Sequence, residues 1–209
     1  MLTASIVVHN TPALQLERAL ECLFRSDVST VYVIDNSPED TLCHIKSIDD
    51  RIIYRHVENN GFGAGHNIAI REILHDGDFH IVMNADVYWD GDIVRQMIGY
   101  IGSREDVGMI APKAFYPDGD LQYSCRMLPA PADLFVKRFL PCCLFKRRME
   151  RYLLAIHNHD ETLNCPYLLG SFLLFRVKAL RECGMFDERF FMYPEDIDIT
   201  RRIHEKWKT

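Results

Sequence analysis

Three carboxylates and two arginines stand close together near the end of the chain: Glu195, Asp196, Asp198, Arg201 and Arg202. They follow an aromatic stretch, Phe186 to Tyr193, and surface acids are seldom packed against so much apolar area. Burial against an apolar wall raises the pKa of a carboxyl group, and such a group can act as a general base near neutral pH. The same pattern is typical of a helix N-terminus, with Pro194 in the first turn and acids favoured by the helix dipole. The two interpretations are compatible, because the start of a helix is a good place to fix a carboxylate.

A second acidic position follows an apolar run, at Asn84-Ala85-Asp86. One carboxylate at the end of a strand can hold a divalent cation whose other positions go to phosphate oxygens and water, as is common for Mg²⁺. Asp35 also follows an apolar run and is a candidate for contact with a nucleotide base or ribose. For both acids the alternative is an Asx turn that closes the strand.

Residues 59–67 form a segment with three alternate glycines and asparagines at both ends. The glycines let the backbone approach a ligand closely, and a helix that follows them offers free N–H groups to a phosphate. A dinucleotide-binding fingerprint requires the pattern G-x-G-x-x-G/A. The pattern fails here, because its sixth position is His66 when counted from Gly61 and Ile68 when counted from Gly63. A polar ligand is favoured by the asparagines, and a plain tight turn is the alternative.

The elements that position these residues alternate between strands and helices. Apolar, β-branched runs predict strands over 5–8, 31–34, 51–57, 80–83 and 107–111. Helices are expected after Pro12, through Leu42 and Ile45 as a short one, over 68–73 and over 92–101. Such alternation predicts βαβ units and a largely parallel sheet, which binds ligands beyond the carboxyl ends of its strands. Asn10, Asp35, the glycine segment and Asp86 all follow predicted strands, so they are expected to share one edge.

Composition and charge restrict the size of the domain and the partners that it can bind. The chain has 209 residues, of which 48% are hydrophobic and 26% charged, enough for one sizeable core and one domain over 1–209. The alternation breaks after residue 111, which divides the domain into a half over 1–111 and a half over 112–209. A net charge of -6 argues against nucleic acid as a partner. The nine histidines match no zinc motif, and the cluster at 157–160 is interpreted as a solvated loop.

Location is predicted from the cysteines and from the apolar runs. Seven cysteines with no CxxC spacing favour a reduced, cytoplasmic setting over a disulfide framework. The start of the chain reads as a strand and not as a signal peptide, and no apolar run is long enough to span a membrane. Residues 203–209 read as a helix end with no following strand, so a chain shorter than the complete fold is expected. Basic residues interleaved with aromatics over 132–155 suit an anionic membrane surface, and a solvated helix hairpin is the alternative.

Taken together, these segments resemble the family-2 glycosyltransferases, and within them the bacterial rhamnosyltransferase-like branch. The resemblance rests on the opening strand at 5–10, the turn at 34–37, the glycine segment at 59–67, Asn84-Ala85-Asp86 in place of the DxD motif, the glycine-containing strand at 169–176 and the FDE…ED-x-D…R segment at 186–202. It covers almost the whole chain in the order of the family. It implies the GT-A fold, an α/β Rossmann-like nucleotide-diphospho-sugar transferase fold with a mostly parallel central sheet flanked by helices.

The resemblance also implies a mechanism and a role for each position. Asp196 is expected to take the proton from the acceptor hydroxyl, which attacks in line with inversion, while Glu195 orients the acceptor or the base. The implied donor-binding residues are Val8, Asn10, Asp35, Asn60, Gly61, Gly63, Asn67, Asn84 and Asp86, with Asp86 holding Mg²⁺ or Mn²⁺ against the diphosphate. The implied acceptor-side residues are Gly170, Ser171, Asp198 and Arg201. Arg201 or Arg202 is expected to pair with the diphosphate or with Asp198.

The expected activity is transfer of a sugar, with rhamnose suggested by the branch, to a lipid-linked or saccharide acceptor in bacterial surface polysaccharide synthesis. The basic-aromatic segment would hold the protein at the inner face of the membrane. The family pattern is departed from in two ways. In the DxD motif, Asn84 replaces the first acid and Ala85 replaces a proline. The chain also ends at Thr209, whereas family members normally continue past the helix that carries the ED motif. A catalytically silent nucleotide-sugar-binding module is therefore an alternative. A nucleotidyltransferase is another, although the residues after the first strand, His9 to Pro12, lack the glycines and the lysine or arginine which that activity usually needs.

Overall fold

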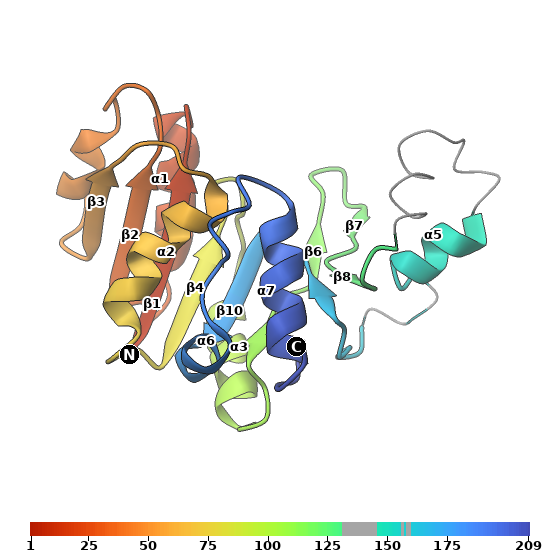
Figure 1. Ribbon diagram of the computed structural model, residues 1–209. Helices are drawn as coiled ribbons and strands as arrows, with labels where there is room; N and C mark the ends of the chain where they lie inside the picture. Colours follow the sequence, from red (N-terminus) through yellow and green to blue (C-terminus); the bar gives the residue numbers. More distant parts are fainter. Residues whose placement is uncertain (131–145, 156, 158–159) are drawn as a thin grey trace.

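The computed structural model describes residues 1–130, 146–155, 157 and 160–209, and its centre is a six-stranded sheet (Figure 1). The strands are β1 (Leu2–Val8), β2 (Thr30–Asp35), β3 (Ile52–His56), β4 (Phe79–Met83), β5 (Met109–Ile110) and β10 (Phe172–Arg176). Their order in the sheet is β3-β2-β1-β4-β10-β5. The pairs β3–β2, β2–β1 and β1–β4 are parallel, whereas β10 runs antiparallel to both β4 and β5. The predicted α/β fold with a mostly parallel sheet is confirmed.

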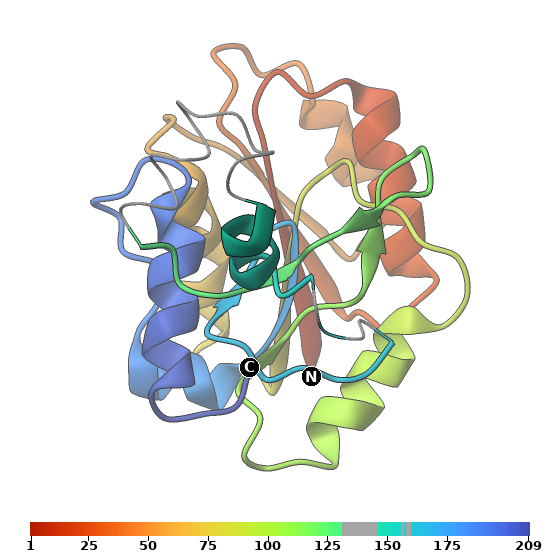
Figure 2. The same ribbon diagram turned by 90° about the vertical axis from the view of Figure 1, so that its right-hand side faces the viewer.

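Helices cover both faces of this sheet (Figures 1 and 2). The helices are α1 (Ala13–Phe24), the 3-10 helix η1 (Cys43–Ser47), α2 (Phe62–Ile73), α3 (Ile93–Gly102), α6 (Val177–Cys183) and α7 (Pro194–His204). Helices α1 and α3 lie on one face, while α2, α6 and α7 lie on the other (Figure 2). In Figure 1 the parallel strands end, and α7 begins, at the upper edge of the sheet. That edge collects the predicted site residues.

The core on the α1 face follows from two sequence periods. Along β1, Ala4, Ile6 and Val8 alternate toward that face and are at most 1% exposed. Helix α1 packs on this face with the residues at positions 16, 19, 20 and 23, all of which are buried. Strand and helix therefore bury matching apolar faces against each other.

On the opposite face of β1, two of its side chains form a hydrogen-bonded series with two buried histidines. The Thr3 hydroxyl contacts His80 Nδ1 at 2.7 Å, and the Ser5 hydroxyl lies 2.9 Å from His80 Nε2 and 2.7 Å from His66 Nδ1. This series links β1, β4 and α2 through the interior. Burial lowers the pKa of His80 to about 3 and holds the pKa of His66 well below its usual value, so both rings are neutral.

The structure differs from the sequence-based expectations in two elements. Helix α2 begins at Phe62, so the predicted loop over 59–65 is helical in its second half. Its glycines permit close packing, because an added Cβ on Gly63 would lie 2.8 Å from Phe186 Cβ and one on Gly65 would lie 2.8 Å from a Val7 methyl group. The strand predicted over 107–111 is shortened to Met109–Ile110. Strand β10, an antiparallel strand, separates β5 from β4.

Smaller elements extend the domain beyond β5 (Figure 1). They are the β6–β7 hairpin (Ala114–Phe115 and Leu121–Gln122), the antiparallel pair of β8 (Cys125–Arg126) with β9 (Tyr167–Leu168), and α5 (Lys146–Tyr152). Most of the predicted basic-aromatic segment lies outside the described residues, and α5 belongs to its last part. Among the helices that the structure describes, none combines the length and apolar character needed to cross a membrane.

Residues after α7 return to the sheet edge near β5. The Gly108 N–H donates to the Lys208 carbonyl at 2.9 Å and the Lys208 N–H donates to the Asp106 carbonyl at 2.8 Å, which makes a parallel bridge between Val107 and Lys208. The residues after α7 thus form an isolated β-bridge and no further strand, as the sequence predicted.

Candidate active site

The carboxyl ends of β1, β2 and β3 are tied together by side chains. The Asn10 N–H donates to the Ser37 hydroxyl at 2.8 Å, and Asn10 has a φ of 51°. One ring nitrogen of His9 lies 2.9 Å from the Asn36 carbonyl and one of His56 lies 2.8 Å from the Ser37 carbonyl. Val8, at the end of β1, is buried beneath this network. The predicted gathering of Asn10 and the turn after β2 at one edge is observed.

Asp35 forms the Asx turn that the sequence offered as an alternative. Its Oδ1 accepts the Ser37 N–H at 2.8 Å and its Oδ2 accepts the Tyr54 hydroxyl at 2.8 Å, in a fully buried position. The neighbouring Asn36 is 4% exposed, and its Oδ1 has no hydrogen-bond partner among the described residues. A buried carbonyl oxygen of this kind normally finds a partner. Contact of Asp35 with a nucleotide stays a prediction.

The end of β4 lies beside the start of β10. The Asn84 N–H donates to the Ser171 carbonyl at 3.0 Å, which places Ser171 and Gly170 next to the Asn84-Ala85-Asp86 turn. Asp86 is exposed. Among the described residues, no three histidine, cysteine or acidic side chains converge as metal ligands. Asp86 therefore suits an ion that is held mainly by phosphate oxygens and water, and not one enclosed by protein groups.

Two carboxyl groups are buried at the start of α7. Glu195 is 4% exposed and Asp196 is 7% exposed, and Pro194 occupies the first turn as predicted. Tyr193, just before the helix, has a φ of 82°, a strained conformation for a residue with a side chain. Burial raises the pKa of both Glu195 and Asp196. The predicted shift of acids held against an apolar wall is thus confirmed in direction.

Hydrogen bonds fix the Asp196 carboxyl group. Its Oδ2 accepts the Tyr167 hydroxyl at 3.1 Å and the Gly170 N–H at 3.1 Å, and its Oδ1 accepts the Ile197 N–H at 2.8 Å. Gly170 packs closely on this side chain, because an added Cβ would lie 3.2 Å from Asp196 Cβ. Together with the bond from Asn84 to Ser171, these contacts connect the end of β4 to the start of α7. Asp86 and Asp196 therefore belong to one edge of the sheet.

Glu195 is held differently from Asp196. An added Cβ on Gly63 would lie 3.4 Å from Glu195 Cγ, so Glu195 packs over the first turn of α2. Its Oε2 is buried and has no hydrogen-bond partner among the described residues. Burial is the largest cause of its raised pKa, and the Asp196 charge raises that pKa further.

The remaining charged residues of α7 separate into two groups. Asp198 accepts the Arg202 Nε–H at 2.8 Å, and Arg202 also donates to the Met185 carbonyl at 2.7 Å. This answers which arginine pairs with Asp198. Arg201 is exposed. Asp198 and Arg202 therefore tie α7 to the preceding loop, whereas Arg201 stands on the surface.

The loop before α7 packs on the start of α2. The Phe191 carbonyl accepts the Phe62 N–H at 3.1 Å, and an added Cβ on Gly61 would lie only 2.3 Å from that carbonyl oxygen. The Asn67 side chain bonds both the N–H and the carbonyl of Phe186, at 3.1 and 2.8 Å. Gly61 and Asn67, predicted to bind the donor, thus hold this loop. Asn60 beside them is exposed.

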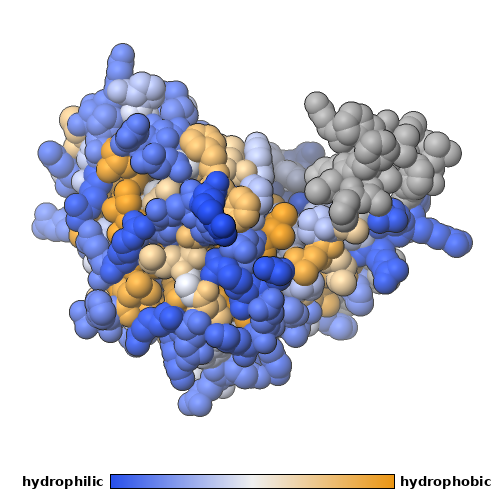
Figure 3. Space-filling model, in the orientation of Figure 1, coloured by the Kyte–Doolittle hydropathy of each residue, from blue (hydrophilic) through white to orange (hydrophobic). Residues whose placement is uncertain are grey.

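The loop also presents three consecutive apolar side chains to solvent. Phe191, Met192 and Tyr193 are 54%, 47% and 79% exposed. Figure 3 shows that hydrophilic residues dominate this face of the molecule and that hydrophobic ones surface between them in separate patches. The apolar tip therefore stands at the same edge as the two buried carboxyl groups.

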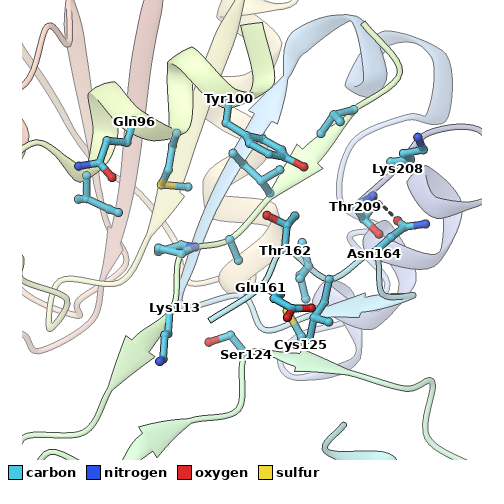
Figure 4. Close-up of a pocket in the computed structure, with 18 of the residues that line it drawn as sticks. Gln96, Tyr100, Lys113, Ser124, Cys125, Glu161, Thr162, Asn164, Lys208 and Thr209 are labelled. Carbon is cyan, nitrogen blue, oxygen red and sulfur yellow. Dashed lines mark hydrogen bonds between the residues drawn. The ribbon is translucent and has the colours of Figure 1, made fainter. Parts of the chain in front are cut away.

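A cavity of about 830 Å³ lies elsewhere, between α3, β5 and the residues before β9 (Figure 4). Its polar lining includes Gln96, Tyr100, Lys113 and Asn164. Among the described residues that line it, none is a predicted site residue. This cavity is therefore separate from the edge of the sheet at which Glu195 and Asp196 lie.

Sequence reasoning missed Tyr167 and Arg126. These residues are paired between β9 and β8, and the Arg126 guanidinium lies 5.8 Å from the centre of the Tyr167 ring. The Arg126 charge opposes the rise in the pKa of Asp196 that burial causes. No local pattern in the sequence indicated that either residue lies close to Asp196.

Known proteins of similar sequence are glycosyltransferases. The family model described as glycosyl transferase family 2 matches residues 3–184. An N-acetylglucosaminyl-diphospho-decaprenol L-rhamnosyltransferase of Mycobacterium tuberculosis is 30% identical over 130 residues, which are 60% of this chain and 41% of the relative. The rhamnosyltransferase WbbL of Escherichia coli is 26% identical over 151 residues, or 68% of this chain and 54% of the relative. The aligned region thus spans about half the length of these relatives or less.

Solved structures support the fold. A mannosyltransferase from Pyrobaculum calidifontis, solved with GDP-Man and Mn²⁺, superposes with a TM-score of 0.63 at 16% identity and covers 99% of this chain and 53% of its own. At that identity the likeness shows the GT-A fold alone. The family match, by contrast, extends over most of the chain and includes the edge at which Asp35, Asp86 and Gly170 lie. The chain belongs to glycosyl transferase family 2.

Proposed function

We propose that this chain transfers a sugar from a nucleotide-diphospho-sugar to an acceptor hydroxyl, with inversion at the anomeric carbon. The observation that carries the proposal is Asp196, a buried carboxylate of raised pKa held by three hydrogen bonds beside the ends of the parallel strands. A general base for a sugar hydroxyl must accept a proton without moving away from the reacting atoms. A rigid carboxylate at the ligand-binding edge of an α/β sheet meets that requirement.

The proposed reaction uses Asp196 as the base. The acceptor hydroxyl gives its proton to the Asp196 carboxylate, and its oxygen forms a bond to the anomeric carbon of the donor. The bond from that carbon to the diphosphate breaks on the opposite side, and the diphosphate leaves with the electron pair. The sugar configuration is therefore inverted. Glu195, packed over α2, orients the acceptor or the base, and Gly170, Ser171, Asp198 and Arg201 form the acceptor side.

The donor is proposed to lie along the ends of β1, β2 and β4. Val8, Asn10, Asp35, Asn60, Gly61, Gly63, Asn67, Asn84 and Asp86 form or support this donor site. Asp35 and Asn67 act on it through the turns and loops that they hold. Asn36 Oδ1, buried and unpartnered, is a further acceptor at this edge for a ligand N–H group.

Asp86 is the residue proposed to hold Mg²⁺ or Mn²⁺. A bound divalent cation would stabilise the negative charge that develops on the leaving diphosphate. The exposed single carboxylate fits such an ion when the donor supplies most of the other ligands. The similar mannosyltransferase was solved with GDP-Man and Mn²⁺, which supports a divalent cation as the cofactor.

The sugar and acceptor are proposed from the relatives. Both relatives are named rhamnosyltransferases, and the name of one specifies a diphospho-decaprenol-linked acceptor. We propose rhamnose as the sugar and a lipid-linked saccharide as the acceptor, in bacterial surface polysaccharide synthesis. The site of action would then be the cytoplasmic face of the membrane, with peripheral contact through residues 132–155.

Two measurements test the proposal. Thermal shifts with dTDP, UDP, GDP and dTDP-rhamnose, each with and without Mn²⁺, report donor binding, because a ligand of the folded state raises the melting temperature. Transfer of labelled rhamnose to a lipid-linked saccharide reports activity. Asp196→Asn should lower the rate at least ~100-fold, as expected for loss of a general base, and keep the nucleotide shift. Equal rates in Asp196→Asn and the wild type would exclude Asp196 as the base, and Glu205→Gln, an exposed change at the end of α7, is the matched control.

A catalytically silent nucleotide-sugar-binding module is the second candidate. It is favoured by Asn84, which stands where the family motif has its first acid and leaves Asp86 as the one carboxylate of that motif. Nucleotide-dependent thermal shifts without transfer or donor hydrolysis would support it. Turnover of any sugar nucleotide would exclude it.

A further inference from the structure

Tyr167 touches the carboxylate to which the proposed function assigns the proton transfer. It lies on β9, is 4% exposed, and donates its hydroxyl to Asp196 Oδ2 at 3.1 Å. Its strand is paired with β8 in antiparallel register, Arg126 opposite Tyr167. The ring is therefore fixed by the strand pair, and its hydroxyl is aimed at one oxygen of Asp196.

The two oxygens of Asp196 have different numbers of hydrogen-bond donors. Each carboxylate oxygen offers two lone pairs. Among the residues that the structure describes, Oδ2 receives both the Tyr167 hydroxyl and the Gly170 N–H, whereas Oδ1 receives only the Ile197 N–H. Oδ2 is thus saturated, and Oδ1 keeps a lone pair that can accept a proton.

We propose that Tyr167 is a positioning residue for Asp196, and that together with the Gly170 N–H it occupies Oδ2 and leaves Oδ1 to receive the proton from the acceptor hydroxyl. This inference rests on the proposed function for the identity of the proton donor. The contact itself does not depend on that function.

Several charged and titratable groups surround Asp196. Glu195 precedes it on α7, Tyr167 contacts it from β9, and Arg126 acts on it from β8. Tyr152, from α5, acts on Tyr167 in turn. Burial raises the pKa of Asp196, while the Gly170 N–H, the Tyr167 hydroxyl and the Arg126 charge lower it. Tyr167 therefore helps to keep the carboxylate ionised in an apolar place.

Loss of the hydroxyl should change the acidity of Asp196 and the chemical step together. In Tyr167→Phe the ring and its packing remain, but Oδ2 loses one of its two donors. The Asp196 pKa should rise by about one unit, since one unit corresponds to a tenfold weaker acid and hydrogen bonds to charged groups are of that order. The acidic limb of the pH profile of kcat should move to higher pH together with the Asp196 pKa. The value of kcat should fall about tenfold, while KM for the donor is unchanged.

The decisive experiment is a ¹³C NMR titration of aspartate carboxyl groups in the full chain. The Asp196 signal is assigned by its absence in Asp196→Asn. Tyr32→Phe, which removes another buried tyrosine hydroxyl on β2, is the matched control. Incorporation of 3-fluorotyrosine at position 167, whose hydroxyl is a stronger donor in the same shape, should move the Asp196 pKa downward. This second variant decides the question even if Tyr167→Phe does not fold.

The outcomes separate this inference from the proposed function. A raised Asp196 pKa in Tyr167→Phe, or a lowered one with 3-fluorotyrosine, supports the positioning role when Tyr32→Phe leaves it unchanged. An Asp196 pKa that responds to neither change overturns that role. If the pKa responds but the wild-type chain transfers no sugar from any donor, the positioning contact stands and the proposed function fails.

Discussion

Acidification is expected to destabilise this protein through the two buried histidines, His66 and His80. Both are fully buried and joined through the Ser5 hydroxyl, and burial depresses the pKa of each. In the unfolded chain their pKa lies near the ordinary value of 6.5. Below that pH the unfolded state binds protons that the folded state refuses, so the free energy of unfolding falls as the pH falls. For His80 this loss continues until its folded pKa of about 3.

The magnitude follows from the size of this window. Each buried histidine lowers the free energy of unfolding by about 1.4 kcal/mol for every pH unit between its unfolded pKa and its folded pKa. Between about pH 6.5 and pH 5 the loss is about 2 kcal/mol for His80, and His66 adds to this loss in the same direction. Small domains have total stabilities of roughly 5–15 kcal/mol. Glu195 and Asp196, whose pKa values are raised, act in the opposite sense, because they regain stability as the pH falls through their folded pKa values.

Urea unfolding at several pH values, followed by tryptophan fluorescence, measures the effect. Comparison with His80→Gln isolates it, since this variant removes one titrating group and leaves the carboxyl groups in place. Its stability should change by about 1.4 kcal/mol per pH unit less than that of the wild type over the same range. His75→Gln, at an exposed position, is the matched control and should keep the wild-type dependence. Equal pH dependence in the wild type and His80→Gln would refute the reasoning.

Three further substitutions test other parts of the site. Gly61→Ala should destabilise the protein by about 3 kcal/mol or more in urea unfolding, because the position has a φ of 103° and the new Cβ would collide with the Phe191 carbonyl; a change below that of an exposed alanine substitution would contradict the packing described. Asn67→Ala should free the loop at Phe186, seen as faster amide hydrogen exchange over residues 186–193, and unchanged exchange there would show that other contacts hold the loop. Asp86→Ala should abolish the Mn²⁺-dependent part of the nucleotide thermal shift, and an intact metal effect would place the ion elsewhere.

Much of the sheet could be predicted, because each parallel strand is an apolar run bounded by turn residues. The runs at 5–8, 31–34 and 80–83 lie within β1, β2 and β4. The direction of β10 could not be predicted in this way. An apolar strand reads the same in either direction, and the long connection from β5 to β10 allows both. The structure fixes the antiparallel choice through the register that runs from Phe172 opposite Met83 to Arg176 opposite Phe79.

The candidate site was predictable where chemistry left a local trace. Acids beside aromatic residues indicated buried carboxylates, and Glu195 and Asp196 are buried. Tyr167 left no such trace, because a tyrosine within an apolar run reads as core. The start of helix α2 was predicted wrongly for a related reason. Its glycines look like a loop, and the neighbours that require them, Phe186 and Val7, are distant in sequence. The roles assigned to individual donor residues and the division after residue 111 stay predictions.

The antiparallel insertion of β10 explains how one edge can hold both ends of the proposed reaction. Parallel strands all end at the same edge, so they can gather donor-side groups there, such as Asn84 at the end of β4. An antiparallel neighbour begins where they end. The residues before β10 therefore meet the end of β4, where the Ser171 carbonyl accepts the Asn84 N–H and the adjacent Gly170 N–H donates to Asp196. Reversing one strand in an otherwise parallel sheet thus places Asp196, the proposed base on α7, near the end of β4 through two hydrogen bonds donated by backbone N–H groups. Such donors hold a carboxylate more rigidly than a flexible side chain could.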